Sequence, residues 1–513
     1  ALGTEWQIRA FDATGKPAWK QDVPGTAWGV DYSADGKILV VAYGDGTIRW
    51  LRWSDGAELL ALFVDVPTRK WVAWTPTGYY MASAGGEDLI GWHLNRGWTQ
   101  EADFFPASRF SDRFNRPDIV KLVLKTRDEG EAVRQADQAA KRKTETASVA
   151  AKLPPVVAIR SPKPDATFDG ETIDVDFDVR SPSGLAVDRV DAQIDGRPVE
   201  ARGVTPASAS GERHLTLPAP PHDVEVSILA RSGDLVGEAA SVRLRYAGRK
   251  ADEAELIKPK LYAVVIGVSD YVEPGLRLGY AAADAHGVAE ALQRQKGGLY
   301  RDVEVRPLVD RDATRLAVID ALEWLDAQVT SRDVGVVMIA GHGYTDEKGS
   351  YWFLPADAQM AHLGGTSVSQ FDLRRAFAAI AGKAIVFLDT CHANAEKTAP
   401  DPTRDVRGLG PGGVDVIRFA NDLAKAENGL VTFASTQGTE LAAERAEWGH
   451  GAFSLALIEG LSGKADLLHK GAVTVSALDY YIAERVKELT NGAQHPVMSR
   501  PDTVPDFAFA TTR

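Results

Sequence analysis

The sequence is poor in cysteine, in long apolar runs and in positive charge, and each of these absences limits what the protein can be. Its 513 residues include a single cysteine, Cys391, which excludes an intrachain disulfide and is compatible with a cytoplasmic location. No apolar run is long enough to cross a bilayer, so we expect no membrane partner. The net charge of −13 argues against a nucleic-acid partner and weakly favours basic substrates. No leader pattern follows Ala1, so a signal peptide would have to precede this residue.

The length and composition indicate a globular protein of several domains. Hydrophobic residues make up 44% of the chain and charged residues 25%, which are ordinary values for a folded protein. A chain of this length is expected to hold two to four domains, at roughly 100 to 200 residues each. The sequence pattern divides it at the boundaries described below.

Residues 1–100 contain an internal repeat with a period of 42 residues. The turn Asp35-Gly36 recurs as Thr77-Gly78, and Thr47–Trp50 recurs as Leu89–Trp92. This period is similar to that of WD-type β-propeller repeats, in which each blade has four short strands. Two and a fraction blades cannot close a ring. We therefore expect either that further blades precede this sequence or that a protein partner covers the open edge, so that the region acts as a docking platform or, equally well, as a spacer.

The next two regions show no residues that suggest chemistry. Residues 101–152 are predicted to form a helical linker, because Asp118–Thr146 combines helical periodicity with many charges. Residues 153–247 alternate polar and apolar residues at period two, which predicts an immunoglobulin-like β-sandwich with a positioning role. Its clearest predicted strands are 172–180, 190–196, 224–231 and 240–246.

Residues 258–513 alternate predicted strands and helices, which indicates an α/β domain with a mostly parallel sheet covered by helices on both faces. The predicted strands outside the site are Leu261–Val268, Val303–Val309 and Gly429–Ala434. The predicted helices are Ala281–Gln295, Arg311–Gln328, Phe371–Ile380, Gly451–Leu461 and Thr474–Leu489.

Two of the predicted strands end in residues that can carry chemistry. Val334–Ala340 is followed by Gly341-His342-Gly343, and Ala384–Leu388 is followed by Asp389-Thr390-Cys391-His392. Ligands and reacting groups collect at the carboxyl ends of such strands. A thiol becomes nucleophilic as the thiolate, and an imidazole on a neighbouring strand can take its proton. The adjacent His392 is a weaker candidate for the base, because neighbours on an extended strand point to opposite faces.

These motifs resemble the catalytic signatures of the caspase-like cysteine peptidases, the group of caspases, metacaspases and bacterial orthocaspases. His342 precedes Cys391 by 49 residues, close to the separation of about 50 found in caspases. Leu278–Ala285 and Trp448–Phe453 also resemble segments of this family, so the similarity covers residues 258–513. Propeller repeats joined to such a peptidase are known in bacteria.

The resemblance assigns roles to individual residues. It implies that Cys391 is the nucleophile, that His342 is the base, and that the backbone amides of Cys391 and Gly343 stabilise the oxyanion. Gly343 lacks a side chain, so we expect the scissile carbonyl to approach its backbone closely. Asp389 and Asp284 correspond to the acidic pocket of metacaspases and orthocaspases, which implies cleavage after Arg or Lys.

Some details of this pocket stay open. Either aspartate, and Asp284 more than Asp389, has the alternative role of capping a helix or turn. Ala340 stands where many metacaspases have serine, which leaves the preference between Arg and Lys undecided.

The segment 394–428 is long, polar and rich in Pro and Gly, which marks it as functional or disordered. The family often cuts itself here, which implies self-cleavage after Arg404, Arg407 or Arg418, with Lys397 less favoured. Metacaspases commonly need calcium, but the sequence shows no ligand cluster. The acids Asp346, Glu347 and Asp357 are scattered, so we predict no metal site and no cofactor, and the dependence on calcium stays open.

Two other functions remain open. One is a scaffold or signalling protein with an inactive caspase fold whose propeller binds a partner. The other is a peptidase with acidic specificity that uses an arginine such as Arg277 or Arg445. The intact Cys and His favour the peptidase acting on a protein or peptide with a basic residue.

Overall fold

The structure is a computed structural model, and it divides into two compact units, Ala1–Ser148 and Val149–Arg513. Among the described helices, none has the length and apolar character needed to cross a membrane. The residues that the structure describes are 1–83, 85–99, 102–141, 153–199, 211–248, 258–346, 350–391, 405–406, 416–423, 425, 429–437, 440 and 442–512.

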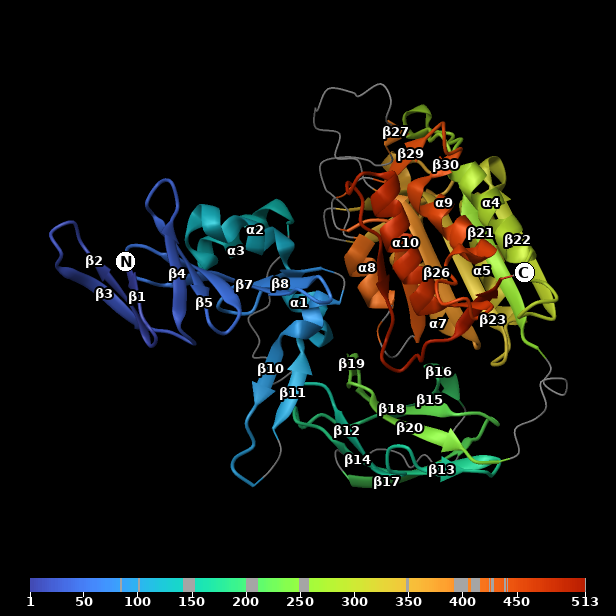
Figure 1. The fold of residues 1–513 in the computed structure, drawn as a ribbon, viewed down its shortest axis with the longest axis horizontal. Helices are drawn as coiled ribbons and strands as arrows, with labels where there is room; N and C mark the ends of the chain where they lie inside the picture. The colour runs from blue at the N-terminus through green and yellow to red at the C-terminus, as the bar shows by residue number, and fades with distance from the viewer. Residues whose placement is uncertain are drawn as a thin grey trace. The chain divides into compact units, whose positions relative to one another are not determined.

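The first unit is built on an antiparallel meander of six strands in sequential order (Figure 1). Three strands at the N-terminus form a separate sheet, and two later strands pair with each other. The six strands are β4 (Ala27–Tyr32), β5 (Ile38–Tyr43), β6 (Thr47–Arg52), β7 (Glu58–Asp65), β8 (Lys70–Trp74) and β9 (Tyr80–Ala82). The smaller sheets consist of β1 (Leu2–Gly3), β2 (Gln7–Phe11) and β3 (Pro17–Asp22), and of β10 (Gly91–Leu94) and β11 (Asp103–Pro106).

The repeated turns of the sequence are present, but the separate blades that they predict are not confirmed. Gly36 and Gly78 have positive φ values of 66° and 97°, and each donates its N–H to the carbonyl three residues earlier. However, β4 to β9 form one continuous ladder in place of two four-stranded blades, because β7 also pairs with β8. A WD-type propeller therefore stays a prediction.

The predicted helical linker contains helices, and these pack on the first unit. Helices α2 (Pro117–Thr126) and α3 (Glu129–Ala139) are amphipathic. Their apolar faces share a buried cluster with side chains of β5, β7 and β8, including Ile119, Val123 and Leu60. The charged residues occupy the outer faces, as the sequence predicts, but this segment is part of a core and not only a connector.

In the second unit, the described residues 153–199 and 211–248 form two sheets that enclose one apolar core. The first sheet has the order β12-β14-β17, and the second has the order β13-β20-β18-β15-β16 with β19 beside β18. Apolar residues of β14, β15, β17, β18 and β20 make up the core. The four predicted strands are confirmed as β14 (Thr172–Arg180), β15 (Arg189–Ile194), β18 (Val224–Ser232) and β20 (Ala240–Tyr246). The immunoglobulin-like topology stays a prediction.

The remaining strands of this sandwich are short or lie at its edges. They are β12 (Val156–Ser161), β13 (Thr167–Phe168), β16 (Arg197–Val199), β17 (Gly211–Pro218) and β19 (Leu235–Val236).

The C-terminal domain has the predicted α/β architecture. Its sheet has the order β22-β21-β23-β26-β28-β32, in which all pairs are parallel except the last. These strands are β21 (Lys260–Gly267), β22 (Asp302–Val309), β23 (Val334–Thr345), β26 (Lys383–Cys391), β28 (Leu430–Ala434) and β32 (Val497–Ser499). A short antiparallel extension, β24 (Tyr351–Leu354) and β25 (Val368–Ser369), follows β23.

Helices cover both faces of this sheet (Figure 1). One face packs against α4 (Ala281–Gln293), α9 (Ala452–Glu459) and α10 (Val475–Leu489). The other face packs against α5 (Arg315–Gln328), α7 (Gln370–Ala379) and α8 (Val416–Leu423). Polar side chains begin several of these helices: Thr314, Ser369 and Thr474 each accept a hydrogen bond from an amide of the first turn.

The two strands that carry the motifs are longer than predicted. Residues along β23 are buried on alternate faces, with Met338 among the side chains on the α9 side and Ile339 among those on the α5 side. The sequence suggests that each strand ends before its motif, yet β23 runs through Gly341–Gly343 and β26 runs through Cys391. The reason is that β24 pairs with residues 342–345, so the strand is extended beyond its apolar part.

Candidate active site

The two motifs lie side by side because β23 and β26 are neighbouring parallel strands. Their register pairs His342 with Cys391 and Ala340 with Asp389. Neighbouring strands in a sheet are about 4.8 Å apart, so the backbones of His342 and Cys391 are adjacent. The structure therefore brings together the two residues that the sequence predicts as base and nucleophile.

The environment of His342 fixes the protonation pattern of its ring. The side chain is buried, and Nε2 lies 2.9 Å from the carbonyl oxygen of Leu276. A carbonyl can only accept, so Nε2 carries the proton and donates it to Leu276. In a neutral imidazole, Nδ1 then holds the lone pair and is the nitrogen that can accept a proton.

Tyr271 holds the same histidine from another side. Its Oη accepts a hydrogen bond of 2.9 Å from the backbone N–H of His342, and the two rings have centroids 5.3 Å apart. The preceding residue, Gly341, has a φ of 155°, and a Cβ added there would lie 2.9 Å from the Tyr271 Oη. A glycine is therefore needed at this position for both the backbone conformation and the packing.

Packing gives a reason for the second glycine of the motif, Gly343. A Cβ at Gly343 would lie 2.8 Å from Cε2 of Tyr351. The space that a side chain at position 343 would need is thus filled by the Tyr351 ring. The close approach of a substrate carbonyl to the Gly343 backbone, and the role of the Gly343 amide, stay predictions.

The two predicted acids are both buried and both bind the beginning of α9. Asp389 Oδ2 accepts a hydrogen bond of 2.7 Å from the Ser454 hydroxyl. Asp284 Oδ1 accepts one of 3.0 Å from the backbone N–H of Gly451, the N-cap residue of α9, and lies 3.0 Å from His450 Nδ1. The positive end of the helix dipole favours negative charge at this place.

Asp284 caps a helix, but the helix is α9 and not the one that contains Asp284. Asp284 lies in the first turn of its own helix, α4, but its carboxylate does not cap that helix, whose Ala282 N–H donates to the Ser269 hydroxyl. Its carboxylate binds the N-cap amide of α9 instead. The structure therefore places Asp284 and Asp389, which are 105 positions apart in the sequence, at one end of one helix.

A third buried carboxylate, which the sequence interpretation missed, belongs to the same region. Glu444 lies in β29 (Ala443–Arg445) and is the register partner of Gly451 in β30 (His450–Gly451). It is 1% exposed, and its Oε2 accepts a hydrogen bond of 3.2 Å from the backbone N–H of Gly279. A single glutamate in a three-residue strand has no periodic signal, so only its closeness to the segments 278–285 and 448–453 could have suggested it. Ser454 was missed because its contact with Asp389 joins segments 65 residues apart.

The arginines considered for acidic specificity occupy different environments. Arg277 is exposed. Arg445 binds Glu447 at 3.1 Å and stacks on the Trp448 ring at 4.8 Å. The described contacts of these two arginines do not bring either of them to Asp389.

The predicted self-cleavage residues are only partly described. Lys397, Arg404 and Arg407 lie outside the described residues, as does His392, the weaker candidate for the base. Arg418 lies within α8, where the backbone is helical. Between Arg404 and Arg407, the two residues Asp405–Val406 form β27 and pair antiparallel with β29, through Glu444 and Ala443.

The scattered acids considered for calcium have other partners. Asp346 accepts hydrogen bonds from the Ser350 N–H and the Trp352 Nε1–H, and Asp357 accepts one from the Arg315 N–H. Glu347 lies outside the described residues. Within the described part of the chain, His, Cys, Asp and Glu form no group of three or more that could hold a metal ion.

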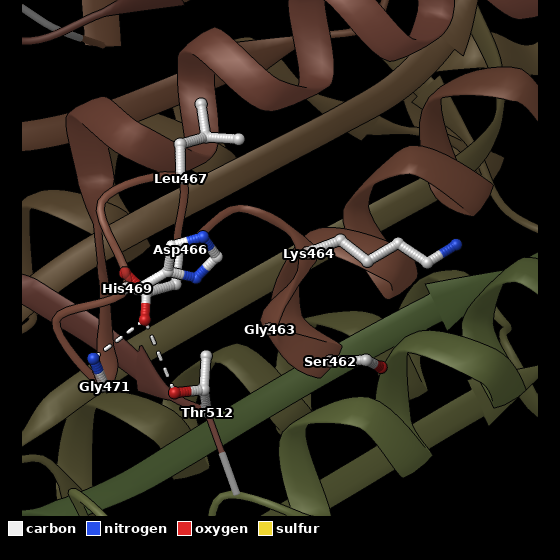
Figure 2. A pocket seen from close by; sticks show the side chains of 8 residues that line it. All are labelled: Ser462, Gly463, Lys464, Asp466, Leu467, His469, Gly471 and Thr512. Atoms are coloured by element: carbon white, nitrogen blue, oxygen red, sulfur yellow. Dashed lines mark hydrogen bonds between the residues drawn. The ribbon is translucent and has the colours of Figure 1, made fainter.

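A large open hollow elsewhere in this domain has no relation to these residues. It has a volume of about 600 Å³, and Figure 2 shows its lining. Asp466 accepts hydrogen bonds there from the backbone N–H groups of Lys470 and Gly471, and Lys464 binds Glu459 at 2.8 Å. Its lining residues are Ser462, Gly463, Lys464, Asp466, Leu467, His469, Gly471 and Thr512, and they offer no nucleophile with an adjacent base.

Comparison with known proteins identifies the domain that carries the site. The family model described as Peptidase_C14, caspase domain, matches residues 260–507. This range begins in β21, contains both motif strands and ends after β32. Residues 260–507 are thus similar to a caspase domain. A search of curated proteins finds no match for the chain.

Solved structures give only distant similarities. Protein GSU0716 from Geobacter sulfurreducens is 17% identical, with a TM-score of 0.34, over 50% of this chain and 95% of its own. The N-terminal Ig1-2 module of the Drosophila receptor protein tyrosine phosphatase DLAR is 17% identical, with a TM-score of 0.14, over 23% of this chain and 62% of its own. A mutant of the SrpA adhesin from Streptococcus sanguinis is 13% identical, with a TM-score of 0.14, over 42% of this chain and 92% of its own. These values support no assignment of function.

Proposed function

We propose that the caspase-like domain of residues 260–507 is an active cysteine endopeptidase that cleaves proteins after arginine, or lysine, with Cys391 as nucleophile and His342 as base. The observation that carries this proposal is the register of β23 and β26, which makes His342 and Cys391 lateral neighbours. The hydrogen bond from His342 Nε2–H to the Leu276 carbonyl supports it further, because it leaves Nδ1 as the proton acceptor.

In this mechanism, His342 Nδ1 takes the proton of the Cys391 thiol, and the thiolate attacks the scissile carbonyl carbon. The carbonyl oxygen becomes an oxyanion, which the backbone N–H groups of Cys391 and Gly343 stabilise. His342 then gives its proton to the leaving amine, which leaves a thioester on Cys391. Water deprotonated by the same imidazole hydrolyses the thioester and regenerates the thiol.

The preference for a basic residue rests on the buried acids. Asp284, Asp389 and Glu444 are each at most 1% exposed. Asp284 and Asp389 accept hydrogen bonds from groups at the beginning of α9, and Glu444 is the register partner of Gly451, the N-cap residue of that helix. Carboxylates brought together in a desolvated place repel one another, and a cation relieves this repulsion. A guanidinium can also bind carboxylates in a bidentate manner, which favours arginine over lysine.

Self-cleavage in the segment 394–428 is part of this proposal. Peptidases of this type need an extended substrate backbone, and Asp405–Val406 is extended and paired with β29. This supports Arg404 or Arg407 as the cleavage residue. Cleavage after Arg418 would require α8 to unfold locally, so we rank it below the other two.

The test uses short fluorogenic peptides that end in Arg, Lys or Asp, with wild type, Cys391→Ala and His362→Gln as a control at an exposed histidine. We expect cleavage after Arg or Lys by wild type and by the control, and none by Cys391→Ala. A peptidyl-arginyl chloromethylketone should add one adduct to the intact protein, and because Cys391 is the only cysteine, a thiol adduct must lie there. Cleavage that survives Cys391→Ala would remove the mechanism, and cleavage only after Asp would remove the acidic pocket.

A further inference from the structure

Tyr351, outside the predicted motifs, contacts both strands that carry the proposed machinery. It begins β24 and is 2% exposed. Its Oη lies 2.8 Å from Oγ1 of Thr390, which is fully buried and stands between Asp389 and Cys391 on β26. A hydroxyl–hydroxyl hydrogen bond thus connects Tyr351 to the residue that immediately precedes the nucleophile.

The same ring packs against β23. The position that a Cβ of Gly343 would occupy is 2.8 Å from Tyr351 Cε2 and 3.1 Å from its Oη. The ring therefore lies in direct contact with the backbone of Gly343. One side chain spans the two strands whose amides, at Gly343 and Cys391, are the proposed oxyanion donors.

A second aromatic residue holds the plane of this ring. Phe419 of α8 stacks on Tyr351 with a centroid distance of 4.5 Å and an interplanar angle of 10°. Phe419 is 3% exposed and belongs to the apolar core on this face of the sheet. The N–H of Tyr351 also donates to Gln370 Oε1 at 3.0 Å, so both the backbone and the ring of this residue are fixed.

We propose that Tyr351 is a positioning residue that sets the spacing between the Gly343 and Cys391 amides, with Phe419 holding its ring in place. This inference rests on the proposed peptidase function. Two hydrogen-bond donors stabilise an oxyanion only when both reach it at about 2.7 to 3.1 Å. A small change in the spacing of β23 and β26 therefore raises the free energy of the transition state more than that of the bound substrate. The acids of the proposed pocket contact α9, which packs on the opposite face of the sheet from Tyr351, so we expect substrate binding to depend little on this contact.

The experiment compares Tyr351→Phe, which keeps the ring stack and removes the hydroxyl, with Tyr480→Phe at an exposed tyrosine as the matched control. We expect Tyr351→Phe to lower kcat about tenfold while KM changes less than about twofold, because a transition-state interaction is lost. Thr390→Val removes the same hydrogen bond from the other side and should have a similar effect, with the double variant no worse than either single one. This second variant keeps the inference testable if Tyr351→Phe fails to fold.

A reversible arginyl aldehyde separates positioning from a general structural role. The aldehyde forms a hemithioacetal whose oxygen needs the oxyanion donors, whereas the same peptide as a carboxamide binds without them. We expect Tyr351→Phe to lose about tenfold in aldehyde affinity and to keep its carboxamide affinity. Phe419→Leu should show the same split.

Two results overturn the inference in different ways. If wild type is active and Tyr351→Phe and Thr390→Val both keep kcat within about twofold, or lose aldehyde and carboxamide affinity equally, only the positioning role fails. If wild type cleaves no peptide and takes up no chloromethylketone at Cys391, the peptidase function fails and the positioning role with it.

Discussion

The backbone of His342 is the lateral neighbour of the backbone of Cys391 on the parallel strands β23 and β26. This relationship depends on the register of the sheet and not on loop conformation. The strand that carries the base therefore also determines the position of the nucleophile. It is the basis of the predictions that follow.

Replacing either residue of the pair should abolish peptidase activity. We expect Cys391→Ala and His342→Ala to lower kcat/KM for an arginyl peptide by about a thousandfold or more, with the double variant no worse than the single ones, since the two act as a unit. The measurement is steady-state cleavage, with circular dichroism to show that both variants are folded. Substantial turnover by His342→Ala would mean that another residue acts as the base.

The pocket acid Asp389 should matter more than the hydroxyl that binds it. Asp389→Asn removes a buried charge that would face the guanidinium, and we expect a loss of about a hundredfold in kcat/KM for arginyl peptides. Ser454→Ala should cost about fivefold to tenfold, because it removes only the hydrogen bond to Oδ2. The exposed Ser462 offers a control, Ser462→Ala. An Asp389→Asn enzyme with unchanged kinetics on arginyl peptides would exclude this acid from the pocket.

Glu444 is expected to contribute to the same preference. Glu444→Gln keeps the shape of the side chain and removes its charge, so kcat/KM for arginyl peptides should fall about tenfold, mostly through KM. The exposed neighbour Glu447 provides the comparison, and Glu447→Gln should leave both constants nearly unchanged. Equal effects of the two substitutions would show that general electrostatic attraction, and not a defined contact, explains the preference.

The contact between Gly341 and Tyr271 can be tested by rescue. Gly341→Ala would place a Cβ 2.9 Å from the Tyr271 Oη, so we expect a loss of stability of about 2 kcal/mol and lower activity. The Tyr271→Phe variant lacks the Oη, which is the atom nearest to the added Cβ. In this variant, Gly341→Ala should therefore lower the free energy of unfolding by less. Urea unfolding of the four proteins of this cycle measures the coupling. A cost that is identical in both backgrounds would place the strain elsewhere.

Asp479 of α10 should make stability depend on pH. Burial raises its pKa to about 6, and the nearby Arg500 offsets only part of this effect. An aspartate in the unfolded chain loses its proton near pH 3.9, so the native protein holds a proton that the unfolded chain has released, and stability falls as pH rises from about 4 to about 6. Asp479→Asn removes this dependence.

The corresponding measurement is Tm as a function of pH. Asp479→Asn should raise stability at pH 7 by an amount on the order of 2 kcal/mol and leave it nearly unchanged at pH 4. Asp326→Asn, at an exposed position, serves as the control. A gain of the same size at both pH values would point to packing and not to ionisation.

The architecture of the C-terminal domain was predictable because its signals are local. Runs such as Val334–Ala340 are buried on both faces, and this produces the continuous β-branched pattern of a central parallel strand. The lengths of the motif strands were not predictable, because the antiparallel pairing of β24 with β23 extends β23 through glycines that locally disfavour a strand.

The site was predictable only where a motif marks it. Cys391, His342 and Asp389 follow apolar strands, and the structure brings their backbones together. Glu444, Ser454 and Tyr351 carry no sequence signal, because their contacts are formed by tertiary structure between segments up to 165 residues apart. The WD-type propeller stays a prediction: the repeated turns exist, and β4 to β9 form one sheet in which β7 also pairs with β8.

Helix α9 links the two aspartates of the proposed pocket through its N-cap amide and through Ser454 in its first turn. A displacement of this one helix along its axis would therefore move both anchoring points by the same amount and in the same direction. A change in the position of α9 would therefore also change the proposed selectivity for the residue before the scissile bond. A redesign that aims at a different side chain in the substrate would have to rebuild the helix start as a whole.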